Sequence, residues 1–120
     1  MTSSGLHLDV VETRGPLAVA SAGGRMDLHT VAGFHRQATA LIDDHPHLIL
    51  DLSGITFCDS SGLNTLLRLR RHADEHGGRL SLVAPADRVM HMLRLTGADT
   101  VFPLYADVTE AQEAQPPGIR

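Results

Sequence analysis

The stretch DLSGITFCDSSGL, residues 51–63, decides how this chain folds. Its first residues belong to HLILDLSGI, residues 47–55, a short and almost continuous apolar run that is typical of a strand covered on both faces. An amphipathic segment comes next, so we predict a strand, a loop and a helix in succession. Functional groups in such sheets lie outside the carboxyl ends of parallel strands, which makes this loop the first candidate site.

The predicted helix after the loop ends at Gly77-Gly78, a natural C-terminal stop. Its apolar stripe consists of Leu63, Leu66, Leu67 and Ala73. The rest of the chain alternates in the same way. Further strands are predicted at 6–12, 17–24, 79–85 and 100–104, and further helices at 30–44, from Asp87 through Val89, Met90, Leu93 and Leu95, and at about 106–114.

The order of the predicted elements is ββαβαβαβα, which indicates an α/β fold. The first two strands form a hairpin at Gly15-Pro16, and strands joined through helices lie parallel with right-handed crossovers. We therefore expect a mixed β-sheet with helices packed on it.

The length of 120 residues predicts a single domain, which we place at residues 6–114. Residues 1–5 are small and polar and are expected to be flexible. The tail 115–120 contains Pro116-Pro117-Gly118, which cannot continue a helix, and is also expected to be flexible.

Charge and composition exclude several classes of partner. A net charge of −4 and a pI of about 6.0 argue against binding to nucleic acid or to an anionic membrane. Cys58 is the single cysteine, which fits a reducing compartment. No secretory signal or transmembrane run of ~18 apolar residues is visible, so we expect a soluble, cytoplasmic protein.

Ser60 and Ser61 have three possible roles. Either serine could cap the following helix by accepting a hydrogen bond from an orphan backbone N–H. Ser60 could instead carry a phosphate, which the free N–H groups and positive dipole of a helix start would stabilise. A hydrolytic nucleophile is disfavoured, because the elbow motif Gly-x-Ser-x-Gly has Cys58 at its first position here.

A second polar stretch, GRMDLHT at residues 24–30, ends the second predicted strand. Asp27 or Thr30 could cap the first helix. Asp27 and Asp59 both follow predicted strands, so they could share one rim of the sheet and surround Ser60 with negative charge. Gly62 would leave room for another protein to approach. The carboxylate beside Cys58 disfavours its thiolate, so a buried small hydrophobe is expected there.

The eight histidines raise the question of a metal. His72 and His76 lie four residues apart on a predicted helix and could chelate an ion. No Cys cluster or His-Glu-x-x-His pattern supports them, and the glycine pairs match no phosphate-binding loop. We therefore predict no metal and no cofactor.

Three stretches together resemble a known family. They are GRMDLHT (24–30), LILDLSGITFCDSSGLNTLLRLRRHADEHGGRLSLVAP (48–85) and VMHMLRLTGADTVFPLYADVTEA (89–111). In order and spacing they resemble the STAS domain, and more narrowly the bacterial anti-sigma factor antagonists, also called anti-anti-sigma factors. The resemblance runs from about Leu6 to Ala114.

The resemblance implies a regulatory switch rather than an enzyme. The first Ser of Asp-Ser-Ser-Gly, here Ser60, would be phosphorylated by the anti-sigma factor, an ATP-dependent Ser kinase, with Ser61 as a secondary site. The unmodified form would bind that kinase and release a sigma factor, and a Ser phosphatase would restore it. The partner surface implied consists of Asp27, Thr30, Asp59, Ser60, Ser61, Gly62 and Asn64. A monomer or weak dimer is expected.

Two alternatives belong to other functional classes. The chain could be a non-switching STAS scaffold or a ligand-sensing module in a stress-signalling assembly. The intact Asp59-Ser60-Ser61-Gly62 disfavours a pure scaffold. A small Ser hydrolase would react with a fluorophosphonate probe, and we expect no such reaction.

Overall fold

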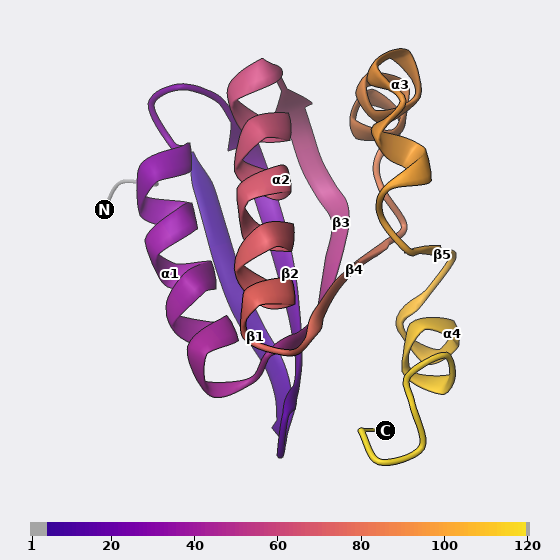
Figure 1. Cartoon of the computed structure of the whole chain (residues 1–120). Coiled ribbons are helices and arrows are strands. Elements are labelled where there is room, and N and C mark those ends of the chain that lie inside the picture. Colours follow the sequence, from indigo (N-terminus) through magenta and orange to yellow (C-terminus); the bar gives the residue numbers. More distant parts are fainter. Residues whose placement is uncertain (1–4, 120) are drawn as a thin grey trace.

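The computed structural model describes residues 5–119 and contains a five-stranded sheet with four α-helices (Figure 1). The elements in chain order are β1 (Leu6–Arg14), β2 (Leu17–Met26), α1 (Val31–Asp44), β3 (His47–Cys58), α2 (Ser60–Glu75), β4 (Arg79–Val83), α3 (Asp87–Thr96), the 3₁₀ helix η1 (Ala98–Thr100), β5 (Leu104–Tyr105) and α4 (Val108–Glu113).

The sheet is mixed, and its strands lie in the order of the sequence, β1-β2-β3-β4-β5. The hairpin β1–β2 is antiparallel, and each later neighbour pairs in parallel through a helical crossover. The predicted fold class and element order are therefore confirmed. Because β2, β3 and β4 run parallel, their carboxyl ends meet at one edge of the sheet.

Helices cover both faces of the sheet. Figure 1 shows α1 and α2 side by side across one face, where they and α3 enclose the larger apolar cluster. Residues from α4 close a smaller cluster on the other face. Along β3, Leu48, Leu50 and Leu52 point into the first cluster and Ile49 into the second, as strand alternation requires. The central strand is thus apolar on both faces, as its sequence predicted.

The end of the chain differs from the expected elements. Residues 98–100 form η1, and the predicted strand 100–104 reduces to Leu104–Tyr105. Pro103 has no N–H to give to a ladder, which keeps the strand short. Leu95, expected in the apolar stripe of α3, is 71% exposed.

Gln115 and Ile119 of the tail contact the rest of the domain, whereas residues 116–118 between them are exposed. Gln115 is buried and its side-chain amide donates to the Ala111 carbonyl. Ile119 packs against the smaller cluster. At the other end, the Gly5 carbonyl accepts a hydrogen bond from the Arg25 amide. Residues 1–4 and 120, also expected to be flexible, lie outside the described residues.

The first residue of β3 predicts how stability depends on pH. The Nδ1 atom of His47 is buried and has no hydrogen-bond partner among residues 5–119. Burial and the Arg79 guanidinium hold the pKa of His47 below its ordinary value. The neutral His47 ring therefore makes its full contribution to the free energy of unfolding above the unfolded pKa, near 6.5. That contribution is lost as pH falls toward the lower folded pKa.

Urea unfolding between about pH 7 and about pH 5 checks this dependence. The His47→Leu variant should lose less stability across that interval than the wild type. Some dependence should remain, because burial, Arg68 and His72 also lower the pKa of His35. An equally steep or steeper loss in His47→Leu would contradict the assignment.

Candidate functional site

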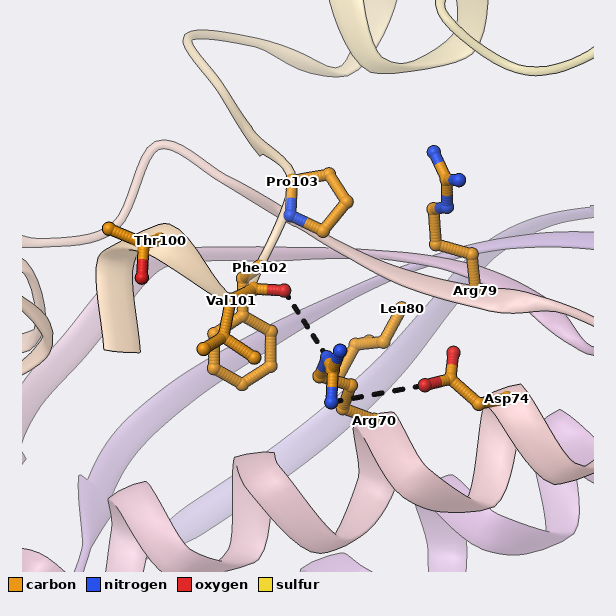
Figure 2. A pocket seen from close by; sticks show the side chains of 8 residues that line it. All are labelled: Arg70, Asp74, Arg79, Leu80, Thr100, Val101, Phe102 and Pro103. Carbon is orange, nitrogen blue, oxygen red and sulfur yellow. Dashed lines mark hydrogen bonds and ion pairs between the residues drawn. The ribbon is translucent and has the colours of Figure 1, made fainter. Parts of the chain in front are cut away.

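A surface cavity lies between α2, the start of β4 and the segment before β5 (Figure 2). Among its lining residues, Arg70 donates from Nε to the Val101 carbonyl at 3.2 Å and pairs with Asp74 at 3.9 Å. Arg79 begins β4, so the cavity lies at the amino end of the parallel strands. Ser60 follows the carboxyl end of β3, at the opposite edge. The cavity is therefore separate from the site that the sequence singled out.

The loops after β2 and β3 meet at the carboxyl edge of the sheet. Met26 pairs with Cys58 at the ends of these strands, and the Asp59 amide donates to the Met26 carbonyl at 3.2 Å. Asp27 and Asp59 thus follow directly paired residues of neighbouring strands, on one rim as hypothesised. We call residues 25–30 and 57–64 the Ser60 edge.

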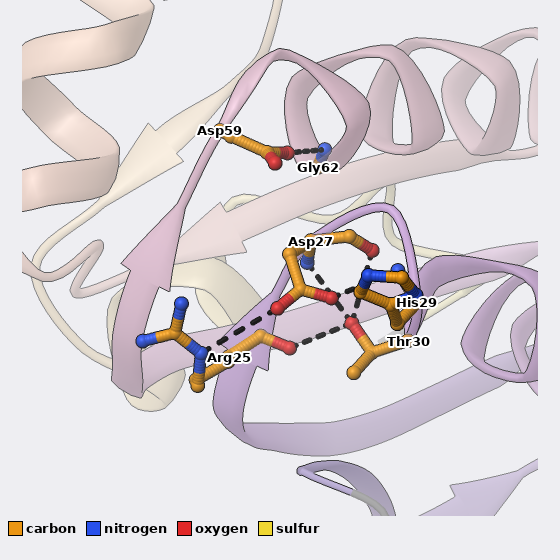
Figure 3. A network of polar contacts seen from close by, with 6 residues as sticks. All are labelled: Arg25, Asp27, His29, Thr30, Asp59 and Gly62. Carbon is orange, nitrogen blue, oxygen red and sulfur yellow. Dashed lines mark hydrogen bonds and ion pairs between the residues drawn. The ribbon is translucent and has the colours of Figure 1, made fainter.

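Asp59, and neither serine, caps α2. Its Oδ1 accepts hydrogen bonds from the Ser61 amide at 2.8 Å and the Gly62 amide at 3.2 Å (Figure 3 draws the second). Its extended backbone is typical of an N-cap residue. The expectation that Ser60 or Ser61 caps the helix is wrong, because the residue one position earlier already satisfies those donors. The same bonds remove two N–H groups that were expected to stabilise a phosphate.

Removing this cap should destabilise the fold. We expect Asp59→Ala to lower the free energy of unfolding by about 1–2 kcal/mol, through loss of two hydrogen bonds and of a favourable dipole interaction. Asp59→Asn is the matched control and should retain most of the stability, because asparagine caps equally well. Chemical denaturation measures both. Equal losses in the two variants would show that the cap geometry is not what stabilises α2.

The hydroxyl of Ser60 is the accessible one. Ser60 is the first residue of α2 and is exposed, whereas Ser61 is half-buried. Asn64 is exposed one helical turn after Ser60, so the two residues share a face of α2. No histidine hydrogen-bonds Ser60 in the part of the chain that the structure describes. The edge therefore presents a free hydroxyl without the base that a nucleophile needs.

Gly62 has a packing role inside the protein. It is buried, and a Cβ at this position would lie 2.7 Å from Cys58 Sγ and 2.9 Å from Met26 Cβ. A glycine here lets the first turn of α2 contact the ends of β2 and β3. The missing side chain is therefore required by this contact inside the protein.

The Asp27 loop is held by its own polar network (Figure 3). Asp27 Oδ1 accepts from the His29 amide at 2.9 Å, and its other oxygen pairs with Arg25 Nε at 3.4 Å. Burial opposes ionisation of Asp27, but these two partners outweigh it and lower the pKa of this carboxyl. Arg25 also lies 4.2 Å above the Phe57 ring. The Arg25 guanidinium therefore lies at the Ser60 edge, held by its contacts with Asp27 and Phe57.

Thr30 is the N-cap residue of α1, but its side chain belongs to this network and makes no capping hydrogen bond. Its Oγ1 accepts from the Asp27 amide at 2.9 Å and donates to the Arg25 carbonyl at 2.7 Å. Neither Asp27 nor Thr30 makes the expected side-chain cap for α1. Both side chains instead fix the conformation of the loop between β2 and α1.

Cys58 behaves as a small core residue. Burial, together with the neighbouring Asp59 carboxylate, raises the pKa of its thiol to about 11. The thiolate is thus suppressed at neutral pH, as the sequence predicted.

Leu28 is a residue that sequence reasoning missed. It lies between the polar residues of the Asp27 loop, and its side chain is 71% exposed. A single leucine in a polar stretch carries no periodic signal, so only its exposure at the Ser60 edge distinguishes it.

Comparison with protein families agrees with this geometry. The model described as "STAS domain" matches residues 7–111, nearly the whole chain. The chain belongs to the STAS domain family. The Ser60 edge is thus the carboxyl edge of a STAS sheet, and Asp59-Ser60-Ser61-Gly62 begins its second helix.

Relatives of this STAS domain include anti-sigma factor antagonists. An anti-sigma F factor antagonist of Paenibacillus polymyxa is 27% identical over 108 residues, covering 88% of this chain and 92% of the relative. The crystal structure of an anti-sigma factor antagonist from Mycobacterium paratuberculosis is 28% identical, with a TM-score of 0.81 over 94% of this chain and 96% of that one.

The fold alone is shared with a more distant structure. SpoIIAA, a Bacillus cell fate determinant, in its phosphorylated form is 20% identical, with a TM-score of 0.70 over 89% of this chain and 97% of that one. No helix of this STAS domain within residues 5–119 has the length and apolar character needed to cross a bilayer.

Proposed function

We propose that this STAS domain is an anti-sigma factor antagonist that is switched off by phosphorylation of Ser60. The observation that carries the proposal is the exposed Ser60 hydroxyl at the start of α2, beside the capping carboxylate of Asp59. The unmodified edge would bind an anti-sigma factor kinase and release a sigma factor. A Ser phosphatase would return the phosphorylated chain to the binding form.

The charge of the Ser60 edge supports a switch that acts by electrostatics. Asp27 and Asp59 contribute two negative charges and Arg25 one positive charge. A phosphate adds about −1.5 to −2 charges at pH 7, so the net charge here falls from about −1 to between about −2.5 and −3. The amides of Ser61 and Gly62 are already bonded to Asp59 and do not offset that charge. A partner that buries this edge would desolvate a dianion beside carboxylates.

Accessibility supports Ser60 over Ser61 as the acceptor. A kinase must reach the hydroxyl, and Ser61 is half-buried with its amide bonded to Asp59. SpoIIAA has the same fold and is known in a phosphorylated form, so this fold accommodates the modification. The partners, a sigma factor and an ATP-using kinase, imply that the protein acts in the cytoplasm.

Leu28 supplies an apolar contact for the proposed partner. We expect Leu28→Ala to weaken binding to the anti-sigma factor by about fivefold to tenfold, because truncation removes apolar area at the interface. Stability should change by less than about 0.5 kcal/mol, since the side chain is exposed. Leu95→Ala is the matched control, because Leu95 is equally exposed but lies on α3. Titration calorimetry measures both, and equal affinities would exclude Leu28 from the interface.

A phosphotransfer assay tests the proposed function. The purified protein is incubated with ATP and each candidate anti-sigma kinase of its own genome, and the modified residue is mapped by intact mass and peptide sequencing. We expect one phosphate on Ser60, absent in Ser60→Ala. Transfer to another residue, or binding without any transfer, would overturn the switch and favour the non-switching scaffold.

A further inference from the structure

Three metal-ligating side chains converge where α1 lies against α2. Asp43 is on the last turn of α1, and His72 and His76 are on the last turn of α2 and its C-cap. One ligand atom from each residue lies within 4.8 Å of the others. From the sequence, only His72 and His76 could be paired as possible ligands, because Asp43 comes from a different helix.

The ring of His76 is held in the orientation of a metal ligand. Its Nδ1 lies 2.8 Å from the His72 carbonyl oxygen, and a carbonyl only accepts, so Nδ1 carries the hydrogen. In the neutral ring Nε2 then has a lone pair, and it lies 3.4 Å from Asp43 Oδ1. A proton on Nε2 joins the two atoms as an ion pair, and with the neutral ring a metal ion can take that place and be bound by both. Metal-bound histidines commonly donate their other ring N–H to a backbone carbonyl in this way.

We propose that Asp43, His72 and His76 bind a divalent transition-metal ion, with Zn²⁺ as the species that fits the ligands best. Two imidazoles four residues apart on a helix and one carboxylate form a recurrent zinc ligand set. Zinc imposes no geometry of its own and accepts nitrogen and oxygen together. Mg²⁺ and Ca²⁺ prefer all-oxygen sites and should not compete.

One separation between ligand atoms already fits a zinc ion, and another must widen. With zinc–ligand bonds of about 2.0–2.1 Å, ligand atoms at tetrahedral positions lie about 3.3 Å apart. The separation of His76 Nε2 from Asp43 Oδ1, 3.4 Å, already fits. His72 Nε2 lies 2.7 Å from the same oxygen and donates to it, so this contact must open and its proton move to Nδ1 or to solvent. The Asp43 and His76 side chains are 54% and 40% exposed, so both can rotate to open this contact. Their exposure also leaves room for a water ligand.

The proposed ion would join α1 to α2 at the end opposite Ser60. Ser60 is the first residue of α2, and His72 and His76 follow it by more than three helical turns. Zinc would thus stabilise the helical layer without occupying the Ser60 edge. The inference stands independently of the phosphorylation switch.

Calorimetric titration of the untagged full-length protein with ZnCl₂ tests the proposal. We expect one Zn²⁺ per chain, and at least roughly tenfold weaker binding in both His76→Gln and Asp43→Asn. His91→Gln is the matched control, because it removes an exposed histidine of α3 and should bind zinc as the wild type does. Zinc at a hundred times Kd should also raise the wild-type Tm by about 10 °C.

Each outcome decides the question. Saturable one-to-one binding that weakens in both site variants, while their metal-free Tm shows them folded, supports the site. Absence of saturable binding in the wild type would overturn it. Binding that both site variants retain unchanged would also overturn it, by placing the ion elsewhere. Phosphotransfer to Ser60 does not depend on any of these results.

Discussion

Replacing Ser60 with aspartate is expected to weaken binding to the cognate anti-sigma factor at least about a hundredfold, or about 2.7 kcal/mol. The new carboxylate would stand next to Asp59 on an exposed turn that the proposed partner covers. Like charges that are desolvated together in an interface cost several kcal/mol. The capping bonds leave the Ser61 and Gly62 amides already occupied, so these two donors do not offset the added charge.

The controls for this variant separate charge from size. Ser60→Asn has nearly the shape of the aspartate without its charge and should bind much more tightly than Ser60→Asp. Ser60→Ala should bind like the unmodified protein and accept no phosphate, which locks it in the binding form. Calorimetry or surface plasmon resonance with the purified kinase gives the affinities. If asparagine weakened binding as much as aspartate, bulk rather than charge would operate the switch.

Truncating Leu66 to alanine is expected to lower the free energy of unfolding by about 3 kcal/mol. Leu66 belongs to α2, and its side chain is fully buried in the larger cluster that this helix shares with the sheet. The loss combines the transfer free energy of the removed carbons with the cavity they leave. Against a typical total of about 5–15 kcal/mol this is a large fraction, and Tm should fall by roughly 10–15 °C.

Leu95→Ala is the matched control for Leu66→Ala. It makes the same chemical change on another helix, at a side chain that is 71% exposed. Its free energy of unfolding should stay within about 0.5 kcal/mol of the wild type. Urea denaturation followed by circular dichroism compares the two. A Leu66→Ala protein as stable as Leu95→Ala would mean that α2 does not depend on its apolar face.

Much of the fold was predictable, because its signals are local. The apolar run 47–55 predicted a central strand, and β3 extends three residues further, to Cys58. The apolar stripe of residues 63–73 predicted α2, and the glycine pair after it predicted where that helix ends. The last strand is shorter than predicted. Periodicity shows which residues could form a strand, but not which of them find hydrogen-bonding partners in the neighbouring strand. Leu95 was named among the apolar residues of the predicted helix, yet its side chain is 71% exposed.

The adjacency of the candidate residues was predicted in part, whereas their function as a binding site stays a prediction. The sequence singled out Asp27, Asp59 and Ser60, and the register of β2 against β3 brings their loops together. Which residue caps α2 depends on where the helix begins, and a shift of one position transfers that role from serine to Asp59. The burial of Gly62 was also out of reach, because it depends on Met26 from another strand.

Periodicity, turn residues and the Asp-Ser-Ser-Gly motif specify the elements, their order and the position of Ser60, because each is written within about ten consecutive residues. The charge around Ser60 and the meeting of Asp43 with His72 and His76 are properties of the tertiary structure alone. They depend on strand register and on the packing of α1 against α2. Such contacts join residues about thirty positions apart, and no local pattern encodes which of them will meet.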